Sequence, residues 1–345
     1  ATIADCATVG RGGGDVDRRL RRGSLAGASR RIPPGSTVPK LSPMNIATEK
    51  AVALVEAHQY ITRFRGKVVV VKVGGSIQED RAKMRALMAD IAFMSAVGMR
   101  PVVVHGGGKS ITAAMDKAGL QARFIQGRRY TDARTLEIAE RILVHEVNRE
   151  LVEDLTDAGA RAIGLHSLGS CVLFAERMYL QGQGGEKIDL GLVGTVTEVN
   201  TILLSALCED GFIPVIAPVA IARQSGEAPA DHDKVSKLNV NADTAAGHVA
   251  AALKAEKLVV CSDTHGIRTD PKNPNSYAST LTRRDIDAMI ASGVIGEGML
   301  PKVEACLVAM AGGVPKTHII DGRVPHSLLL EIYTDAGVGT QITWD

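Results

Sequence analysis

The residues best suited to chemistry in this chain lie at the end of a run of valines. Residues 66–76 read GKVVVVKVGGS, where Lys72 is the only charge among the valines and Gly74 and Gly75 follow. A valine run bounded by glycine predicts a strand buried on both faces, as in a parallel sheet. A lysine at the end of such a strand is costly to bury unless it meets an anion, and the glycines let backbone N–H groups approach something bulky and negative. The pattern predicts a phosphate site at the C-terminal end of this strand.

A second glycine-rich turn follows the next predicted strand, in the segment His105-Gly106-Gly107-Gly108-Lys109-Ser110. Neither standard motif fits it, because a P-loop would need glycine at Val103 and a dinucleotide fingerprint would need glycine at Ile111. Many glycine-rich turns are only tight turns. Two strand–turn–helix units on neighbouring strands would instead aim backbone N–H groups and helix N-termini at one anion.

Further polar groups stand at predicted helix starts. Asn239 and Asn241 precede a helix, and either could cap its N-terminus. Asp243 would lie on the first turn of this helix and face the same way as Asn239. Lys302 follows Pro301, a residue typical of the first helical position. A lone lysine in such a place is usually a solvated surface charge.

The elements that must position these residues alternate between strand and helix. Strands are predicted over 68–73, 101–104, 212–219, 258–262 and 317–320. Helices are predicted over 47–64, 80–96, 109–118, 132–155, 285–292 and 303–311, with another starting near residue 242. Residues 164–193 are predicted to form hairpins that project from the sheet, and residues 223–237 a polar loop. This alternation predicts an α/β fold, a three-layer αβα sandwich with a mainly parallel central sheet and ligands at the C-terminal ends of its strands.

Composition excludes several classes of protein. The chain has 345 residues, 45% of them hydrophobic, which suffices for one large or two modest domains. Residues 44–345 carry a mildly acidic balance, so no basic field for nucleic acid is expected. The longest apolar runs fall short of 18 residues, so no membrane span is expected. The five cysteines are odd in number and form no C-x-x-C pair, which favours a reducing compartment such as the cytoplasm over disulfides or a zinc site.

The first 43 residues are rich in Gly, Ser, Arg and Pro, and they are predicted to be a disordered leader. An organelle transit peptide and a translation start at Met44 are the alternatives. The helix predicted after this leader could contact another subunit or pack on its own domain, and its periodicity does not decide between the two.

Eight segments resemble the amino acid kinase family, and within it the acetylglutamate kinases. They are VKVGGS (71–76), VVVHGGGKSI (102–111), QGRRYTD (126–132), DLGLVGTVTEVN (189–200), GFIPVIAPV (211–219), LNVNADTAA (238–246), SDTHGIR (262–268) and GEGMLPKVEAC (296–306). The resemblance implies ATP-dependent phosphorylation of the γ-carboxylate of N-acetyl-L-glutamate in arginine biosynthesis. It also implies Mg²⁺ that bridges the nucleotide phosphates, with no metal ligand from protein side chains.

The resemblance assigns roles to individual residues. Lys72 and Lys302 would approach the transferred phosphoryl group from opposite sides, and Asp243 would hold both lysines. Other roles follow the same pattern: Gly74, Gly75, Gly107 and Gly108 would meet phosphate oxygens; Gly107, Gly108, Arg129 and Asn239 would bind the substrate; Lys72, Ser262, Asp263 and Lys302 would bind the nucleotide.

The resemblance extends to the arginine-inhibited branch of the family. Tyr60, His318, Glu331 and Gly337 match its effector site, and the N-terminal helix matches one that interlaces homodimers into a homohexamer. The implied division is a leader over 1–43, an oligomerisation helix over 44–66, an acetylglutamate-binding and dimerisation lobe over 67–237, and a nucleotide-binding lobe over 238–345 with the arginine site.

The chain departs from the family pattern in several places. His166-Ser167-Leu168-Gly169-Ser170 replaces the usual S-G-x-D-G, in a hairpin that would help enclose the substrate. Arg128 stands where leucine is usual, and the loop at 224–237 is longer than the norm. These departures leave open a sister kinase that acts on an aminoadipate derivative. A non-catalytic, arginine-sensing kinase-like domain is a second alternative, although the presence of both Lys72 and Lys302 favours catalysis.

Overall fold

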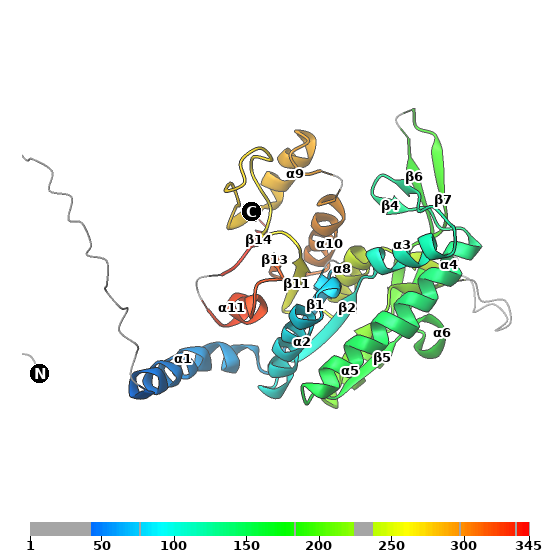
Figure 1. Ribbon diagram of the computed structural model, residues 1–345. Helices are drawn as coiled ribbons and strands as arrows, with labels where there is room; N and C mark the ends of the chain where they lie inside the picture. The colour runs from blue at the N-terminus through cyan, green and yellow to red at the C-terminus, as the bar shows by residue number, and fades with distance from the viewer. Residues whose placement is uncertain are drawn as a thin grey trace, which may run out of the picture. The chain divides into compact units, whose positions relative to one another are not determined.

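A sheet of eight strands forms the centre of the chain, as seen in a computed structural model (Figure 1). The structure describes residues 43–344, except Ser76, Gln183, residues 224–236, Glu297 and residues 335–336. Residues 1–49 form a separate unit, of which only the start of α1 (Pro43–Phe64) is described. Apart from Pro43, the predicted leader therefore lies outside the described residues.

The central sheet is mainly parallel, as predicted. Its strands in spatial order are β12 (Thr280–Thr282), β14 (Thr340–Thr343), β13 (Thr317–Asp321), β11 (Lys257–Ser262), β1 (Val68–Val73), β2 (Arg100–His105), β8 (Ile213–Ile216) and β5 (Ala162–Leu165). Among these neighbours only β13 and β14 run antiparallel. The predicted strands over 68–73, 101–104, 258–262 and 317–320 are confirmed within one residue at each end.

The valine run occupies the middle of this sheet as β1. Its side chains alternate between two cores, with Val70 in one and Val69, Val71 and Val73 in the other. β1 pairs with β2 on one side and β11 on the other, so both glycine turns follow neighbouring strands. The N–H of Gly106 donates to the Val73 carbonyl at 2.9 Å, which joins the two turns at the strand ends.

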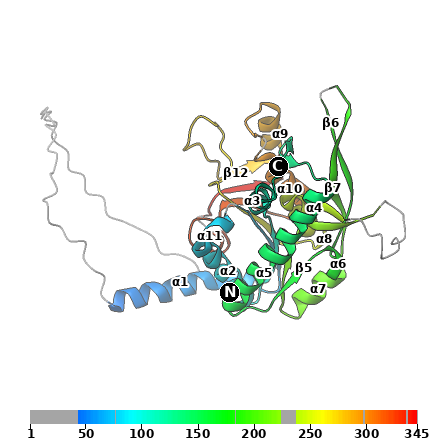
Figure 2. The same ribbon diagram turned by 45° about the vertical axis from the view of Figure 1, so that its right-hand side comes forward.

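Helices cover both faces of the sheet, which confirms the three-layer sandwich (Figures 1 and 2). One core contains residues of α2 (Arg81–Ala96), α3 (Gly108–Lys117), α4 (Ala133–Glu140), η2 (Arg141–Asn148), α5 (Arg149–Asp157) and α11 (Ser327–Tyr333). The other contains residues of α7 (Thr201–Glu209), α8 (Ala242–Ala252), α9 (Arg283–Ala291) and α10 (Leu300–Ala311). The helix predicted over 132–155 is α4, η2 and α5 in succession, of which η2 is a π-helix.

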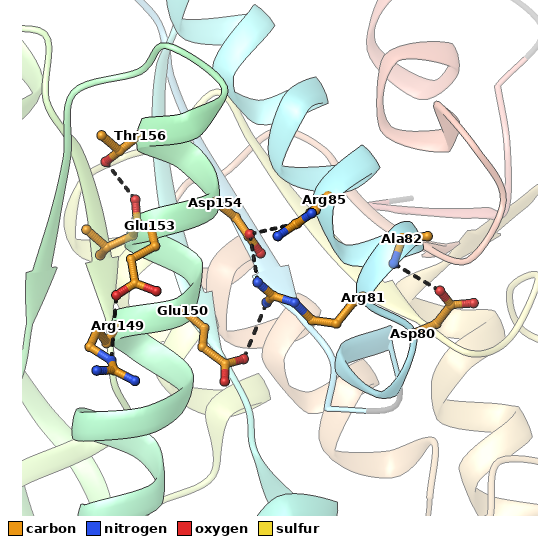
Figure 3. A network of polar contacts seen from close by, with 10 residues as sticks. Asp80, Arg81, Ala82, Arg85, Arg149, Glu150, Glu153, Asp154 and Thr156 are labelled. Atoms are coloured by element: carbon orange, nitrogen blue, oxygen red, sulfur yellow. Dashed lines mark hydrogen bonds and ion pairs between the residues drawn. The ribbon is translucent and has the colours of Figure 1, made fainter.

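A buried carboxylate fixes α2 against α5 (Figure 3). Asp154 of α5 is 2% exposed at its side chain and accepts from Arg81 Nη2 at 2.9 Å and Arg85 Nε at 3.4 Å. Arg81 also reaches Glu150 at 3.3 Å, one turn earlier on α5. These contacts hold α2, which begins shortly after the first glycine turn, in a fixed position on the sheet.

Among its described residues, the segment predicted as hairpins forms only one hairpin. Within it, β5 joins the main sheet, α6 (Ser167–Ser170) is a single turn, and β6 (Leu173–Gln181) pairs with β7 (Lys187–Val199) as a long hairpin, green in Figure 1. The hairpin closes into a small barrel with β9 (Val219–Ala222) and β10 (Lys237–Val240). The prediction of a hairpin at 166–170 was wrong, because the Ser170 N–H donates to the His166 carbonyl and closes a helical turn.

The segment predicted as one strand over 212–219 belongs to two strands, β8 in the sheet and β9 in the barrel. The chain changes direction between them at Pro218, because proline has no N–H to donate to a strand ladder. The predicted loop at 223–237 lies outside the described residues except for Arg223 and Lys237. A small hairpin, β3 (Phe124–Ile125) and β4 (Arg128–Arg129), and the 3₁₀ turn η1 (Ile77–Glu79) complete the described elements. None of the described helices is both long enough and apolar enough to span a membrane.

Candidate active site

Three charged side chains from three elements meet at the C-terminal end of β1. Lys72 Nζ lies 2.7 Å from Asp243 Oδ1, and Lys302 Nζ lies 3.9 Å from Asp243 Oδ2. Asp243 is placed by the start of α8, where the Asn241 side chain accepts from the N–H groups of Asp243 and Thr244. Of the two predicted caps, Asn241 is therefore the N-cap, while Asn239 belongs to β10. The two lysines thus flank one buried carboxylate.

The electrostatics of this group keep Asp243 ionised. Burial disfavours its charged form, but Lys72 and Lys302 outweigh that effect and hold the pKa of Asp243 below its usual value. Lys302 is less enclosed than Lys72, with side chains 18% and 6% exposed, and it also donates to the carbonyl of Gly298 at 3.0 Å. One carboxylate can therefore orient two ammonium groups toward the same space.

The glycine turns supply backbone N–H groups beside these lysines. Gly75, Gly106, Gly107 and Gly108 line a cavity of about 450 Å³ that also contains Lys72 and Asp243. Gly107 is the N-cap of α3 and makes no side-chain capping bond, so the first N–H groups of α3 are available to an anion. A Cβ on Gly107 would lie 2.7 Å from Leu143 Cδ2 of η2, so a larger residue there would require the Leu143 side chain to move.

His105, which precedes the turn, has a defined tautomer. Asn148 of η2 donates through Nδ2 to the Val215 carbonyl at 2.8 Å and to His105 Nε2 at 3.1 Å. Because Nε2 then accepts, His105 Nδ1 carries the hydrogen and donates to the Gly106 carbonyl at 3.0 Å. Burial lowers the pKa of His105 to about 4, so the ring is neutral at pH 7. This neutral imidazole holds the peptide that follows it.

The burial of His105 predicts a loss of stability in mild acid. The unfolded chain binds a proton on this residue near pH 6.5, whereas the folded chain does so only near pH 4, so folding becomes less favourable as the pH falls between these values. The loss should reach about 2 kcal/mol at pH 5. His105→Asn should remove it, measured as the free energy of unfolding in urea at pH 7 and pH 5. Replacing the exposed His58 is the control, and equal pH slopes for wild type and His105→Asn would refute the assignment.

Arg129 faces the same cavity from the β3–β4 hairpin. Its Nη2 donates to the Gly108 carbonyl at 2.8 Å and to Thr112 Oγ1 at 2.7 Å, and the residue is 8% exposed. Burial lowers its pKa, and Asp116 opposes that shift. Across the described part of the chain no carboxylate forms an ion pair with Arg129. A buried guanidinium next to an open cavity is suited to a carboxylate or phosphate ligand.

The other predicted site residues fall into two groups. Asn239 lines the cavity and donates through Nδ2 to Thr131 Oγ1 at 3.2 Å. The second group lies outside the lining of this cavity, at the same end of the sheet, and consists of Gly74, Ser262, Asp263 and Lys302. Gly74 donates its N–H to the Cys261 carbonyl at 3.0 Å, so this N–H belongs to the sheet. Described residues of the 166–170 segment do not line the cavity.

Several residues at the site were not predicted from the sequence. Arg128, Glu304 and His248 line the cavity, and Asn148 supports the second turn. The departure of Arg128 from the family pattern was visible, but nothing in the sequence indicated its partner. Asn148 carried no signal, because its contacts to His105 and Val215 cross long stretches of chain.

A second cavity, of about 310 Å³, contains all four residues matched to the effector site. Tyr60, His318, Glu331 and Gly337 line it together with Lys257, which was not predicted. Glu331 lies 2.8 Å from His318 Nε2 and 3.0 Å from Lys257 Nζ. Burial disfavours its charged form, but His318 and Lys257 hold the pKa of Glu331 below its usual value. The cavity therefore presents an ionised carboxylate.

Comparison with known proteins agrees with this geometry. The profile of the amino acid kinase family matches residues 67–321. The chain is 45% identical over 297 residues to an acetylglutamate kinase of Symbiobacterium thermophilum, covering 86% of this chain and 98% of that protein. It is 43% identical over 296 residues to an acetylglutamate kinase of Synechococcus elongatus, covering 86% and 93%.

Among solved structures, an N-acetylglutamate synthase from Neisseria gonorrhoeae, in complex with coenzyme A and N-acetyl-glutamate, has a similar fold. The TM-score is 0.73 at 23% identity, over 86% of this chain and 63% of the synthase chain. At that identity the likeness concerns the fold alone. With the family profile and the two curated relatives, the assignment is plain: this chain belongs to the amino acid kinase family, among the acetylglutamate kinases.

Proposed function

We propose that this chain transfers the γ-phosphoryl group of ATP to the γ-carboxylate of N-acetyl-L-glutamate, giving N-acetyl-L-glutamyl 5-phosphate in arginine biosynthesis. The observation that carries the proposal is the buried guanidinium of Arg129, which faces the same cavity as Lys72, Asp243 and two glycine turns. This arrangement suits a substrate that has one carboxylate to be held and another to be phosphorylated. The acetylglutamate kinase relatives, which align over nearly their whole length, support the same substrate.

The lysines are the catalytic groups in this proposal. Phosphoryl transfer needs in-line positioning and neutralisation of the charge that spreads over the moving group. Lys72 and Lys302 would neutralise it from two sides, and Asp243 fixes both ammonium groups before the reaction, so little reorganisation is needed in the transition state. The N–H groups of Gly75 and Gly108 would bind transferring oxygens.

Substrate binding falls to the first lobe. Arg129 would bind the α-carboxylate of acetylglutamate through its planar fork, and Asn239 would hydrogen-bond the same molecule. Gly107 and Gly108 would contact it through their backbones. All four residues line the main cavity, which has a volume in the range usual for small-ligand sites.

The nucleotide would lie over the second lobe, near Ser262, Asp263 and Lys302. Of the central sheet, β1, β2, β5 and β8 come from residues 67–237 and β11 to β14 from residues 238–345, which supports this division into lobes. In the part of the chain that is described, no three His, Cys, Asp or Glu side chains gather as a metal site, so Mg²⁺ would be carried by the ATP phosphates. When bound, Mg²⁺ would offset phosphate charge. The four described cysteines are free, as suits the cytoplasm.

Trapping of the acyl phosphate with hydroxylamine tests the proposal. N-acetyl-L-glutamate, an N-acetylated aminoadipate and glutamate would be compared side by side with ATP and Mg²⁺, and hydroxamate should form fastest with acetylglutamate. Faster product from the aminoadipate derivative would identify the sister kinase. No product from any of the three would favour a kinase-like sensor.

Arginine inhibition and a homohexamer of dimers are proposed on separate grounds. The second cavity holds a buried, ionised Glu331 that could accept a guanidinium, with Tyr60 of α1 at its wall. On α1, Val52, Leu54 and Val55 are 49%, 66% and 75% exposed. Exposed apolar side chains on one helix support a contact with another subunit, and the cavity lies at the end of that helix.

One pair of variants tests both ideas. Removal of residues 1–65 should reduce the hexamer to dimers and abolish arginine inhibition, because it deletes α1 and Tyr60 together. Glu331→Gln should raise the arginine concentration for half-inhibition by at least about tenfold while the hexamer persists, since it removes the charge proposed to bind the effector and leaves α1 intact. Light scattering and a dose–response curve give the two readouts. A hexamer that survives the truncation, or unaltered inhibition in Glu331→Gln, would contradict the respective proposal.

A further inference from the structure

An ion pair between two residues that line the main cavity joins the two lobes. Arg128 Nη2 of β4 lies 2.8 Å from Glu304 Oε2 of α10, 176 residues later in the chain. The side chain of Arg128 is only 10% exposed and that of Glu304 is 35% exposed. Both residues line the cavity that contains Lys72 and Asp243. The contact is therefore partly shielded from water and adjoins the reacting groups.

Glu304 lies on a helix that is closely packed against its neighbour. It follows Lys302 by two residues on α10, and α10 packs backbone to backbone on α8, where a Cβ on Gly247 would lie 2.5 Å from the Ala305 carbonyl oxygen. The same α8 carries Asp243 in its first turn. Glu304 thus shares one packed helix pair with two of the three charged groups of the site.

Arg128 lies on a short hairpin, β3 and β4, which has less support than α10. β3 and β4 have two residues each, joined by Gln126 and Gly127, both with positive φ. A two-stranded hairpin of this length has little stability of its own. Its other supports include the Gln126 side chain, which donates to the Gln181 carbonyl at 3.4 Å, the backbone pairing of Thr131 with Leu190 and Leu192, and the bonds from Arg129 to α3. Among the described contacts of the hairpin, the salt bridge from Arg128 to Glu304 connects it to α10.

The hairpin also carries the proposed substrate ligand. Arg128 and Arg129 are neighbours on β4, and they reach different helices, Arg128 reaching α10 and Arg129 reaching α3. We propose that Arg128 and Glu304 are positioning residues, a salt bridge that holds the hairpin against α10 and so keeps Arg129 over the bound substrate. This inference rests on the proposed acetylglutamate kinase activity.

The proposal predicts different changes in KM for the two substrates, which a kinetic assay can measure. Arg128→Leu and Glu304→Gln should each raise KM for acetylglutamate about tenfold, the effect of losing a shielded hydrogen bond between charged groups. KM for ATP should change less than about twofold, because the residues proposed to bind the nucleotide near Ser262, Asp263 and Lys302 are not held by the hairpin. The double variant should be no worse than either single variant, and the charge exchange Arg128→Glu with Glu304→Arg should recover part of the loss.

Glu304→Gln distinguishes this role from a direct contact. If Arg128 bound the substrate itself, freeing it from Glu304 would lower KM or leave it unchanged, and that result would overturn the proposal, as would additive effects in the double variant. Arg283→Leu, which breaks an ion pair with Asp287 on α9, is the matched control and should leave both KM values unchanged. An inactive wild-type enzyme would refute the proposed function, whereas an active wild type with unaltered KM in both single variants would refute only the salt-bridge role.

Discussion

Lys72→Met is expected to lower kcat by about a thousandfold, with a much smaller effect on either KM. The methionine keeps the length and apolar stem of the lysine but removes the ammonium group that lies 2.7 Å from Asp243 and that we propose neutralises the transferred phosphoryl group. Loss of one preorganised charge from such a site typically costs two to three orders of magnitude (about 10²–10³) in turnover. Lys302→Met should behave alike, because in the proposed mechanism the two lysines would act on the same group from opposite sides.

The control for this result lies just before the same strand begins. Lys67 is 54% exposed at its side chain and pairs with Glu256, so Lys67→Met should leave turnover within about twofold. Because Lys72→Met leaves the buried Asp243 with one cation at 3.9 Å, loss of folding could imitate loss of catalysis. Lys72→Arg, which retains the charge but not the geometry, separates the two. Near-normal turnover in a folded Lys72→Met enzyme would refute the mechanism.

The sequence alone was sufficient where local chemistry determines structure. The valine run of β1 must be buried on both faces, and Gly98, with a φ of +91°, ends the helix before β2 as expected. For α8 the sequence predicted a cap at Asn239 or Asn241, and Asn241 is the cap because its side chain reaches two free N–H groups. The same logic placed Lys72 and both glycine turns at one edge of the sheet.

Contacts between distant segments could not be predicted from the residues. The barrel of β6, β7, β9 and β10 depends on pairings across long loops, and so does the addition of β12 and β14 to the sheet. Short strands such as β12 have too few residues for a clear period. Arg128 with Glu304 and Lys257 with Glu331 are similar cases at the side-chain level, since each pair joins residues that only the fold brings together.

Arg129→Lys is expected to raise KM for acetylglutamate by about a hundredfold while KM for ATP changes little. A lysine keeps the charge, but it cannot donate to the Gly108 carbonyl and Thr112 and still offer a planar pair of N–H groups to a carboxylate. Among the described residues no carboxylate forms an ion pair with Arg129, and its hydrogen bonds and Asp116 offset only part of the cost of burying this cation, so an anion that enters the cavity should stabilise it further. Acetylglutamate should therefore raise the melting temperature of the wild type more than that of Arg129→Lys.

The nearby Arg123 supplies the control for this variant. Its guanidinium lies 5.4 Å from the ring of Tyr130, beyond the cavity lining, so Arg123→Lys should leave KM for acetylglutamate within about twofold. Equal increases in KM for both substrates would show that Arg129 supports the fold of the site, because a change confined to the carboxylate contact cannot weaken ATP binding. An increase limited to acetylglutamate, together with the smaller thermal shift, would identify Arg129 as the group that recognises the substrate and would separate its role from that of the two lysines, whose loss acts on kcat.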